Sequence, residues 1–223
     1  MKKINWLDHI TNLLVVILGI SIAFYLEGYR AEKDNQAQER RYLESLVTDL
    51  NADIEALDTL IQVNDMIIKA TNSLSSATNE SGYDDHSKLR NDVLMIQYNP
   101  PLVPQGTIYE SMKASGKMDL VNDFELRNKL VELYEQYYRG TSQYDEALDQ
   151  HLRDFIKPFF IKSIRYTSGT TVEGDFLQSP EFQNIIFSYR YLFEAKNDFY
   201  REVRKQVEEV KELVKARLTL LSY

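Results

Sequence analysis

The feature that most constrains this chain is an uncharged apolar stretch that runs directly into a long charged segment. Residues 13–26, LLVVILGISIAFYL, carry no charged side chain. Residues 29–69 are rich in charge and contain neither proline nor glycine. Both segments favour helix, and no proline separates them. The sequence therefore predicts one continuous rod that begins in an apolar environment and ends in water.

The apolar stretch has three interpretations. A signal peptide would use Lys2 and Lys3 as its basic start and Ser21 to Ala23 as its cleavage site, but the apolar run continues past that site. A soluble core helix would carry a polar face, which this stretch lacks. We favour a retained membrane span over residues 10–29, which at 1.5 Å per residue is long enough to cross the hydrocarbon core.

This span predicts roles for individual residues. Trp6, Tyr25 and Tyr29 stand where interfacial aromatic residues are expected. Gly19 and Ala23 are four residues apart, so they share a helix face on which a second span could pack closely. The alternative is that these small residues simply face lipid.

The chain then divides into a leader (1–9), the span (10–29) and a helical stalk and bundle domain (30–223). The net charge of the chain is −8, which gives no general attraction for nucleic acid. There is no cysteine, so disulfides and thiolate sites are excluded.

Two long segments carry apolar seams whose spacing alternates between three and four residues, as in helix-on-helix packing. The first seam comprises Leu43, Val47, Leu50, Ile54, Leu57, Ile61, Asn64 and Ile68. The second comprises Ile186, Tyr189, Phe193, Lys196, Tyr200, Val203, Val207, Val210, Val214, Arg217 and Leu221. We predict an all-α fold, in which the membrane helix continues into the first long helix of an antiparallel bundle. The C-terminal residues LTLLSY would then return to the membrane surface. The alternative is that each seam pairs with its own copy in a parallel oligomer.

Local signals punctuate the rest of the chain. Thr107 is a candidate helix cap, and Asn122 with Glu125 forms a possible capping box. Gly116 fits a helix C-terminus, and Ser179 before a proline fits a helix start.

Breakers and loops are predicted from composition. Gly140 is expected to interrupt a helix, and Pro158 to end or kink one. Polar residues near 71–88 and 167–178 predict exposed loops.

At this point the sequence resembles a family of short bacterial single-pass membrane proteins known only as a domain of unknown function. The resemblance is carried by TIYESMKASGKMDLVNDFELRNKLVELYEQYY, with Thr107, Ser115-Gly116, Met118 and Leu120, and by SPEFQNII. LEGYRAEK departs from the segment that the family usually has after its span. The resemblance implies a helical architecture in the bacterial inner membrane with an extracytoplasmic domain, and it implies no site residues. Basic residues that flank the span instead favour a cytoplasmic domain by count.

Little in the chain indicates chemistry. Of His9, His86 and His151, only His151 has carboxylates at helical spacing, and the Glu-x-x-His pairs of a helical metal site are missing. A small ligand pocket is a possible reading of one aromatic patch, although helix core is the alternative. The patch comprises Tyr134, Tyr137, Tyr138 and Tyr144.

We therefore expect a non-enzymatic interaction or scaffold protein, or an accessory subunit of a membrane complex, with no cofactor. Its expected partners are the lipid bilayer and either a second copy or another membrane protein, and not nucleic acid. One alternative is an extracytoplasmic ligand-sensing bundle that signals through a lateral membrane partner. The other is an enzyme with a site near His151.

Overall fold

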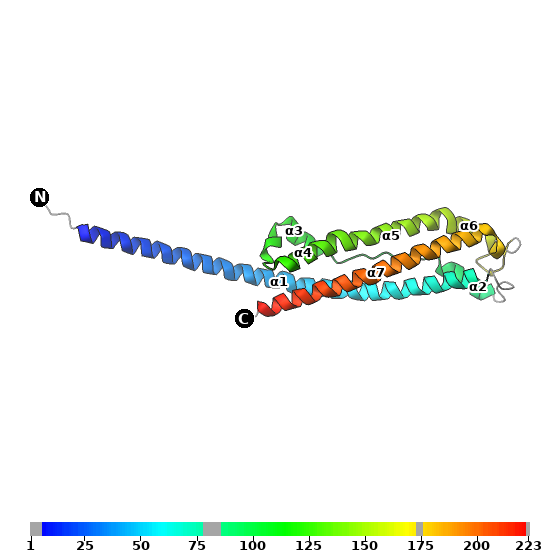
Figure 1. The fold of residues 1–223 in the computed structure, drawn as a ribbon, viewed down its shortest axis with the longest axis horizontal. Coiled ribbons are helices and arrows are strands. Elements are labelled where there is room, and N and C mark those ends of the chain that lie inside the picture. Colours follow the sequence, from blue (N-terminus) through cyan, green and yellow to red (C-terminus); the bar gives the residue numbers. More distant parts are fainter. Residues whose placement is uncertain (1–5, 78–85, 173–175, 222–223) are drawn as a thin grey trace.

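The computed structural model describes residues 6–77, 86–172 and 176–221, with side chains from residue 12 onward, and its described elements are all helical (Figure 1). The predicted all-α class is confirmed. The α-helices are α1 (Trp6–Ser76), α2 (His86–Met95), α3 (Thr107–Ala114), α4 (Phe124–Glu132), α5 (Tyr138–His151), α6 (Lys157–Ser163) and α7 (Pro180–Leu220). Two 3₁₀ turns, η1 (Lys117–Leu120) and η4 (Phe176–Gln178), and two π-helical turns, η2 (Leu133–Tyr137) and η3 (Leu152–Ile156), complete them.

The longest element, α1, is a single helix of 71 residues. Side chains 12–35 are all exposed, and continuous burial against the rest of the molecule begins at Glu39. The first part of α1 therefore projects alone from the bundle (Figure 1). We call the end of the bundle at Glu39 the stalk end and the end at Ser76 the far end.

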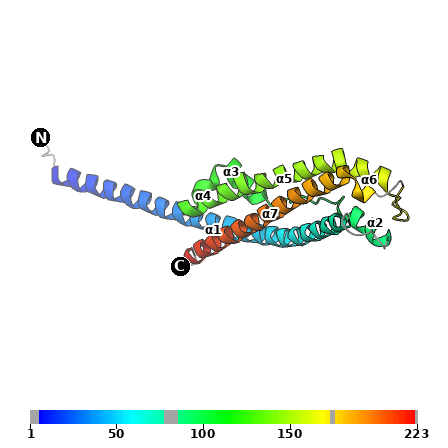
Figure 2. The same cartoon turned by 45° about the vertical axis from the view of Figure 1, so that its right-hand side comes forward.

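Helix α7 packs antiparallel against α1, as Figures 1 and 2 show from two directions. Asn197 donates to Asp65 (2.7 Å) toward the far end, and Arg217 binds Glu39 (2.8 Å) at the stalk end. Most residues of the two predicted seams are buried, so the seams meet within one chain. Val47 and Ile68 are half-buried, and Leu46 and Ile67 occupy the core in their place.

A third layer lies on α7 and consists of α4, η2, α5, η3 and α6 in direct succession. The predicted interruption at Gly140 is wrong, because α5 runs through it. A Cβ at Gly140 would lie 2.6 Å from the Phe199 ring, so this glycine serves a close approach of α5 to α7. Pro158 does not end the helix either. The Lys157 N–H bonds back five residues to the Leu152 carbonyl, and this π turn opens the helix where proline lacks a donor.

Several predicted boundaries shift. Residues 71–76 are helical and not loop, because Thr71 and Leu74 are buried and the Thr71 hydroxyl bonds the Ile67 carbonyl (2.8 Å). The N-cap of α4 is Asp123 and not Asn122. Thr107 begins α3 and makes no side-chain cap, since Gly106 is the N-cap.

Two other predicted signals are confirmed. Gly116 has a left-handed φ of 68°, a value that favours glycine. Ser179 caps α7 by accepting from the Phe182 N–H at 3.2 Å.

The buried ion pair between Glu39 and Arg217 is expected to hold the last turns of α7 against α1 at the stalk end. Glu39 is only 1% exposed, and both of its oxygens accept from Arg217. Arg217→Ala leaves this carboxylate buried without its partner, so we expect a loss of about 3 kcal/mol and faster amide exchange in the last turns of α7.

Hydrogen exchange with mass spectrometry measures this effect. Arg40→Ala is the matched control, because the Arg40–Glu44 pair is half-exposed on both sides and contributes less than about 1 kcal/mol. Equal exchange in the two variants would contradict the structural role of the buried pair.

Candidate functional site

The helical run on α7 is disturbed at η3, near the far end of the bundle. A π turn inserts a residue into a helix and is frequent at functional sites. Here the turn is followed by Pro158, and it leaves the ring of Phe155 50% exposed. The local sequence thus produces an apolar side chain on the surface, next to the start of α7.

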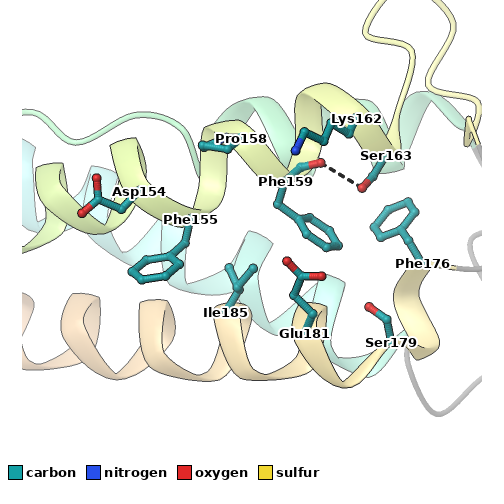
Figure 3. Close-up of a pocket in the computed structure, with 10 residues that line it drawn as sticks. All are labelled: Asp154, Phe155, Pro158, Phe159, Lys162, Ser163, Phe176, Ser179, Glu181 and Ile185. Carbon is teal, nitrogen blue, oxygen red and sulfur yellow. Dashed lines mark hydrogen bonds between the residues drawn. The ribbon is translucent and has the colours of Figure 1, made fainter.

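A cleft of about 560 Å³ lies between η3 and α6 on one side and the start of α7 on the other (Figure 3). Its lining comprises Asp154, Phe155, Pro158, Phe159, Lys162, Ser163, Phe176, Ser179, Glu181 and Ile185. In Figure 3 the Phe159 ring and the Glu181 carboxylate project into its centre, from α6 and α7 respectively. We call this cleft, with the adjoining one described next, the far-end groove.

The second cleft, about 350 Å³, shares Phe155 and Ile185 with the first and adds His151, Asn184 and Ser188. The His151 ring lies between neighbours, with its centroid 5.6 Å from that of Tyr189 and 5.0 Å from that of Phe155. Burial lowers the pKa of His151, while the Ile185 carbonyl and Asp154 raise it in part. The imidazole is therefore held toward its neutral form.

The groove carries charges of both signs. Asp154, Lys162 and Glu181 form no ion pair with any described residue. These charges lie beside the exposed ring of Phe155 and the half-buried ring of Phe159.

The arrangement around His151 does not resemble a hydrolytic site. His151 Nε2 lies 3.3 Å from Ser188 Oγ, but this hydroxyl donates to the Asn184 and Ile185 carbonyls of its own helix (2.9 and 3.1 Å). A hydroxyl bonded in this way is not activated as a nucleophile. Among the residues that the structure describes, no three His, Cys, Asp or Glu side chains gather as metal ligands would.

The four tyrosines predicted to line a pocket separate into two pairs. Tyr134 and Tyr138 are buried, and their hydroxyls donate to the Gln105 carbonyl (3.1 Å) and to Asp53 (2.6 Å). Tyr137 and Tyr144 stack on the opposite side against Phe199, with centroids 6.5 and 5.1 Å away. The four rings therefore do not converge on one cavity. Along this helical run, Tyr134 and Tyr138 lie on one face, and Tyr137 and Tyr144 lie on another.

Sequence reasoning missed a set of buried polar groups that hold residues 97–106, an extended segment between α2 and α3 that we call the strap. Lys196 is fully buried and donates to Asn99 (2.7 Å) and the Pro100 carbonyl (3.0 Å). It also pairs with Asp145 at 2.8 Å. Burial lowers the pKa of Lys196, and Asp145 opposes that shift. The sequence signal that could have revealed these groups is Lys196, a charged residue at a position of the second apolar seam.

The strap is also held nearer the stalk end. Asp53 is 1% exposed and accepts from the Gln105 N–H (2.8 Å) and the Tyr138 hydroxyl (2.6 Å). Burial raises the pKa of Asp53, and these two hydrogen bonds partly offset the rise. Tyr200 accepts from the Leu102 N–H (3.1 Å) and donates to Asp145 (2.9 Å). We assign Asp53 and Tyr200 structural roles, because their hydrogen bonds are made to other groups of the protein.

The residues predicted to act in the membrane lie on the exposed part of α1. One stretch of this helix, near the N-terminus, is long and apolar enough to cross a membrane, and none of it is buried. Gly19, Ala23, Tyr25 and Tyr29 are all exposed. The side chain of Trp6 lies outside the described residues.

Comparison with known proteins gives one match. The model of a family described as "Family of unknown function (DUF6090)" covers residues 12–187, more than three quarters of the chain. The chain belongs to this family. The DUF6090 match begins at the apolar stretch and ends within α7, so it includes η3 and every residue that lines the groove except Ser188. No curated protein and no solved structure matches the chain significantly.

Removing Asp53 tests the hold on the strap. Asp53→Ala leaves the Gln105 N–H and the Tyr138 hydroxyl without their acceptor, and we expect a loss of about 2–3 kcal/mol in the free energy of unfolding. Asp53→Asn is the control, because its amide oxygen still accepts from Gln105, and it should lose less than half as much. Denaturant unfolding measures both, and equal losses would contradict the hydrogen-bond account.

The lowered pKa of His151 predicts a pH dependence. Protonation is harder in the folded state, so stability is fully present above about pH 6.5 and falls as pH drops through the folded pKa. His151→Asn should reduce the fall in Tm between pH 7.5 and 5. An unchanged fall in the His151→Asn variant would refute the assignment.

Proposed function

We propose that this protein is a membrane-anchored helical interaction protein whose bundle meets a protein partner at some distance from the bilayer. The observation that carries the proposal is α1. This one helix joins an unburied apolar stretch to the core of the bundle. A rigid connection of this kind suits an arm that holds a binding surface at a set height.

The alternatives to an anchor are less well supported. A soluble core helix buries its apolar residues, whereas residues 13–26 are exposed. A cleavable signal would end inside α1, although α1 continues without a break to Ser76. The family match includes the apolar stretch, which favours a lasting role for it. We place the protein in the bacterial inner membrane with the bundle on the extracytoplasmic side.

The far-end groove is the surface we assign to the partner. The last residue of α1, Ser76, is 47 residues beyond Tyr29, so the groove stands about 70 Å above the bilayer. The exposed ring of Phe155, with charged side chains around it, matches the aromatic centre and polar rim of protein interfaces. The partner is either a second copy of the chain or another membrane protein whose domain extends to the same height above the bilayer. The proposal involves no catalytic step.

Photo-cross-linking in native membranes tests the proposal. A photoreactive amino acid in place of Phe155, inside the groove, should give one discrete adduct, whose mass spectrum contains either a second copy or one other membrane protein. The same amino acid in place of the exposed Glu55 on α1 should give none. A second change in the groove, Glu181→Lys, should reduce the adduct severalfold. Extraction of the protein from membranes by carbonate, or equal cross-linking at both positions, would refute the proposal.

A further inference from the structure

We infer that the stalk end of the bundle rests on the lipid headgroup layer through Phe124 and Leu220. This inference depends on the membrane anchor proposed above and adds a second, peripheral contact with the same bilayer. It concerns the end of the molecule opposite to the far-end groove.

The register of the helices sets the height of Leu220. Arg217 binds Glu39, so the last turn of α7 lies beside that part of α1. Glu39 is ten residues beyond Tyr29, which corresponds to about 15 Å along the helix axis. Leu220 is three residues further toward the span, and its backbone therefore stands about 10 Å above the level of Tyr29.

Phe124 lies at the same end through independent contacts. Lys129, later in α4, pairs with Glu209 of α7 at 3.5 Å. The carboxylate of Glu39, and more weakly that of Asp123 next to Phe124, raise the pKa of Arg217, which places the start of α4 near the end of α7. Figures 1 and 2 show α4 beginning at the level where α7 ends, with the stalk of α1 leaving between them.

Both side chains are exposed at this end of the bundle. Phe124 is 67% exposed and Leu220 is 68% exposed. Phe124 is the first residue of α4, and Leu220 is the last residue of α7. The Arg127 guanidinium lies 5.7 Å from the centre of the Phe124 ring. An aromatic ring, a leucine and an arginine are the residue types that contact the membrane–water boundary.

The bilayer is the occupant that this geometry favours. The headgroup layer extends about 5–7 Å beyond the hydrocarbon on each side, so the side chain of Leu220, whose backbone stands about 10 Å above Tyr29, comes within reach of it. Phe124 stands higher at the same end and approaches the headgroups when the bundle leans toward its side. Transmembrane helices are tilted by about 20° from the bilayer normal on average, and such a tilt brings one side of the stalk end closer to the headgroups. Because the chain is acidic overall, anionic headgroups would not attract it, and we expect the contact to form with zwitterionic lipid.

Fluorescence quenching in vesicles tests this contact, because Trp6 is the only tryptophan of the chain. The full chain is placed in phosphatidylcholine vesicles that contain a lipid with a nitroxide on its headgroup. In the variant Trp6→Phe with Phe124→Trp, we expect the emission to fall at least twofold relative to vesicles without nitroxide. In the control, Trp6→Phe with Phe187→Trp, a similarly exposed ring near the start of α7, at the far end of the bundle, should show no change.

The outcomes separate the contact from the anchor. Quenching of Trp6 in the natural chain without quenching at position 124 would overturn the contact and leave the anchor intact. Absence of quenching of Trp6 as well would overturn the anchor itself. Trp6→Phe with Leu220→Trp provides a second position should the change at Phe124 disturb folding, and it should be quenched to a similar degree.

Discussion

The antiparallel contact between α1 and α7 fixes where every other part of the molecule lies. Neither helix is stable in water with its apolar seam exposed, and each covers the seam of the other over most of its length. The fully buried Leu43, Leu57, Val207 and Val214 belong to this contact. Because α1 is continuous, the same contact also sets the orientation of the bundle relative to the apolar stretch.

Polar groups inside the contact add specificity at some cost in stability. Asn64 is fully buried, and neither atom of its amide has a hydrogen-bond partner among the described residues. Lys196 and Asp53 are buried as well, but the strap satisfies them. A shift of α7 by one turn would remove Lys196 from Asn99 and the Pro100 carbonyl, so this buried lysine opposes alternative registers of the two helices.

The large-scale arrangement was predictable because it follows from periodicity. The seams, the Ser179 cap and the Gly116 turn are local patterns, and the structure reproduces them. The groove beside η3 was not predictable, because it depends on how α6 meets α7 in space. Gly140 illustrates the limit. Its sequence signal is that of a helix breaker, whereas its actual role is to admit the ring of Phe199.

The central claim is that α7 returns along α1 within the same chain. Spin labels on Arg40→Cys and Lys215→Cys, both exposed positions at the stalk end, test it most directly in a chain with no native cysteine. Since packed helices lie 8–10 Å apart, we expect a label separation below about 25 Å that persists when labelled protein is diluted with unlabelled protein. A longer separation, or a short one that disappears on dilution, would contradict the account, because the seams would then pair between chains.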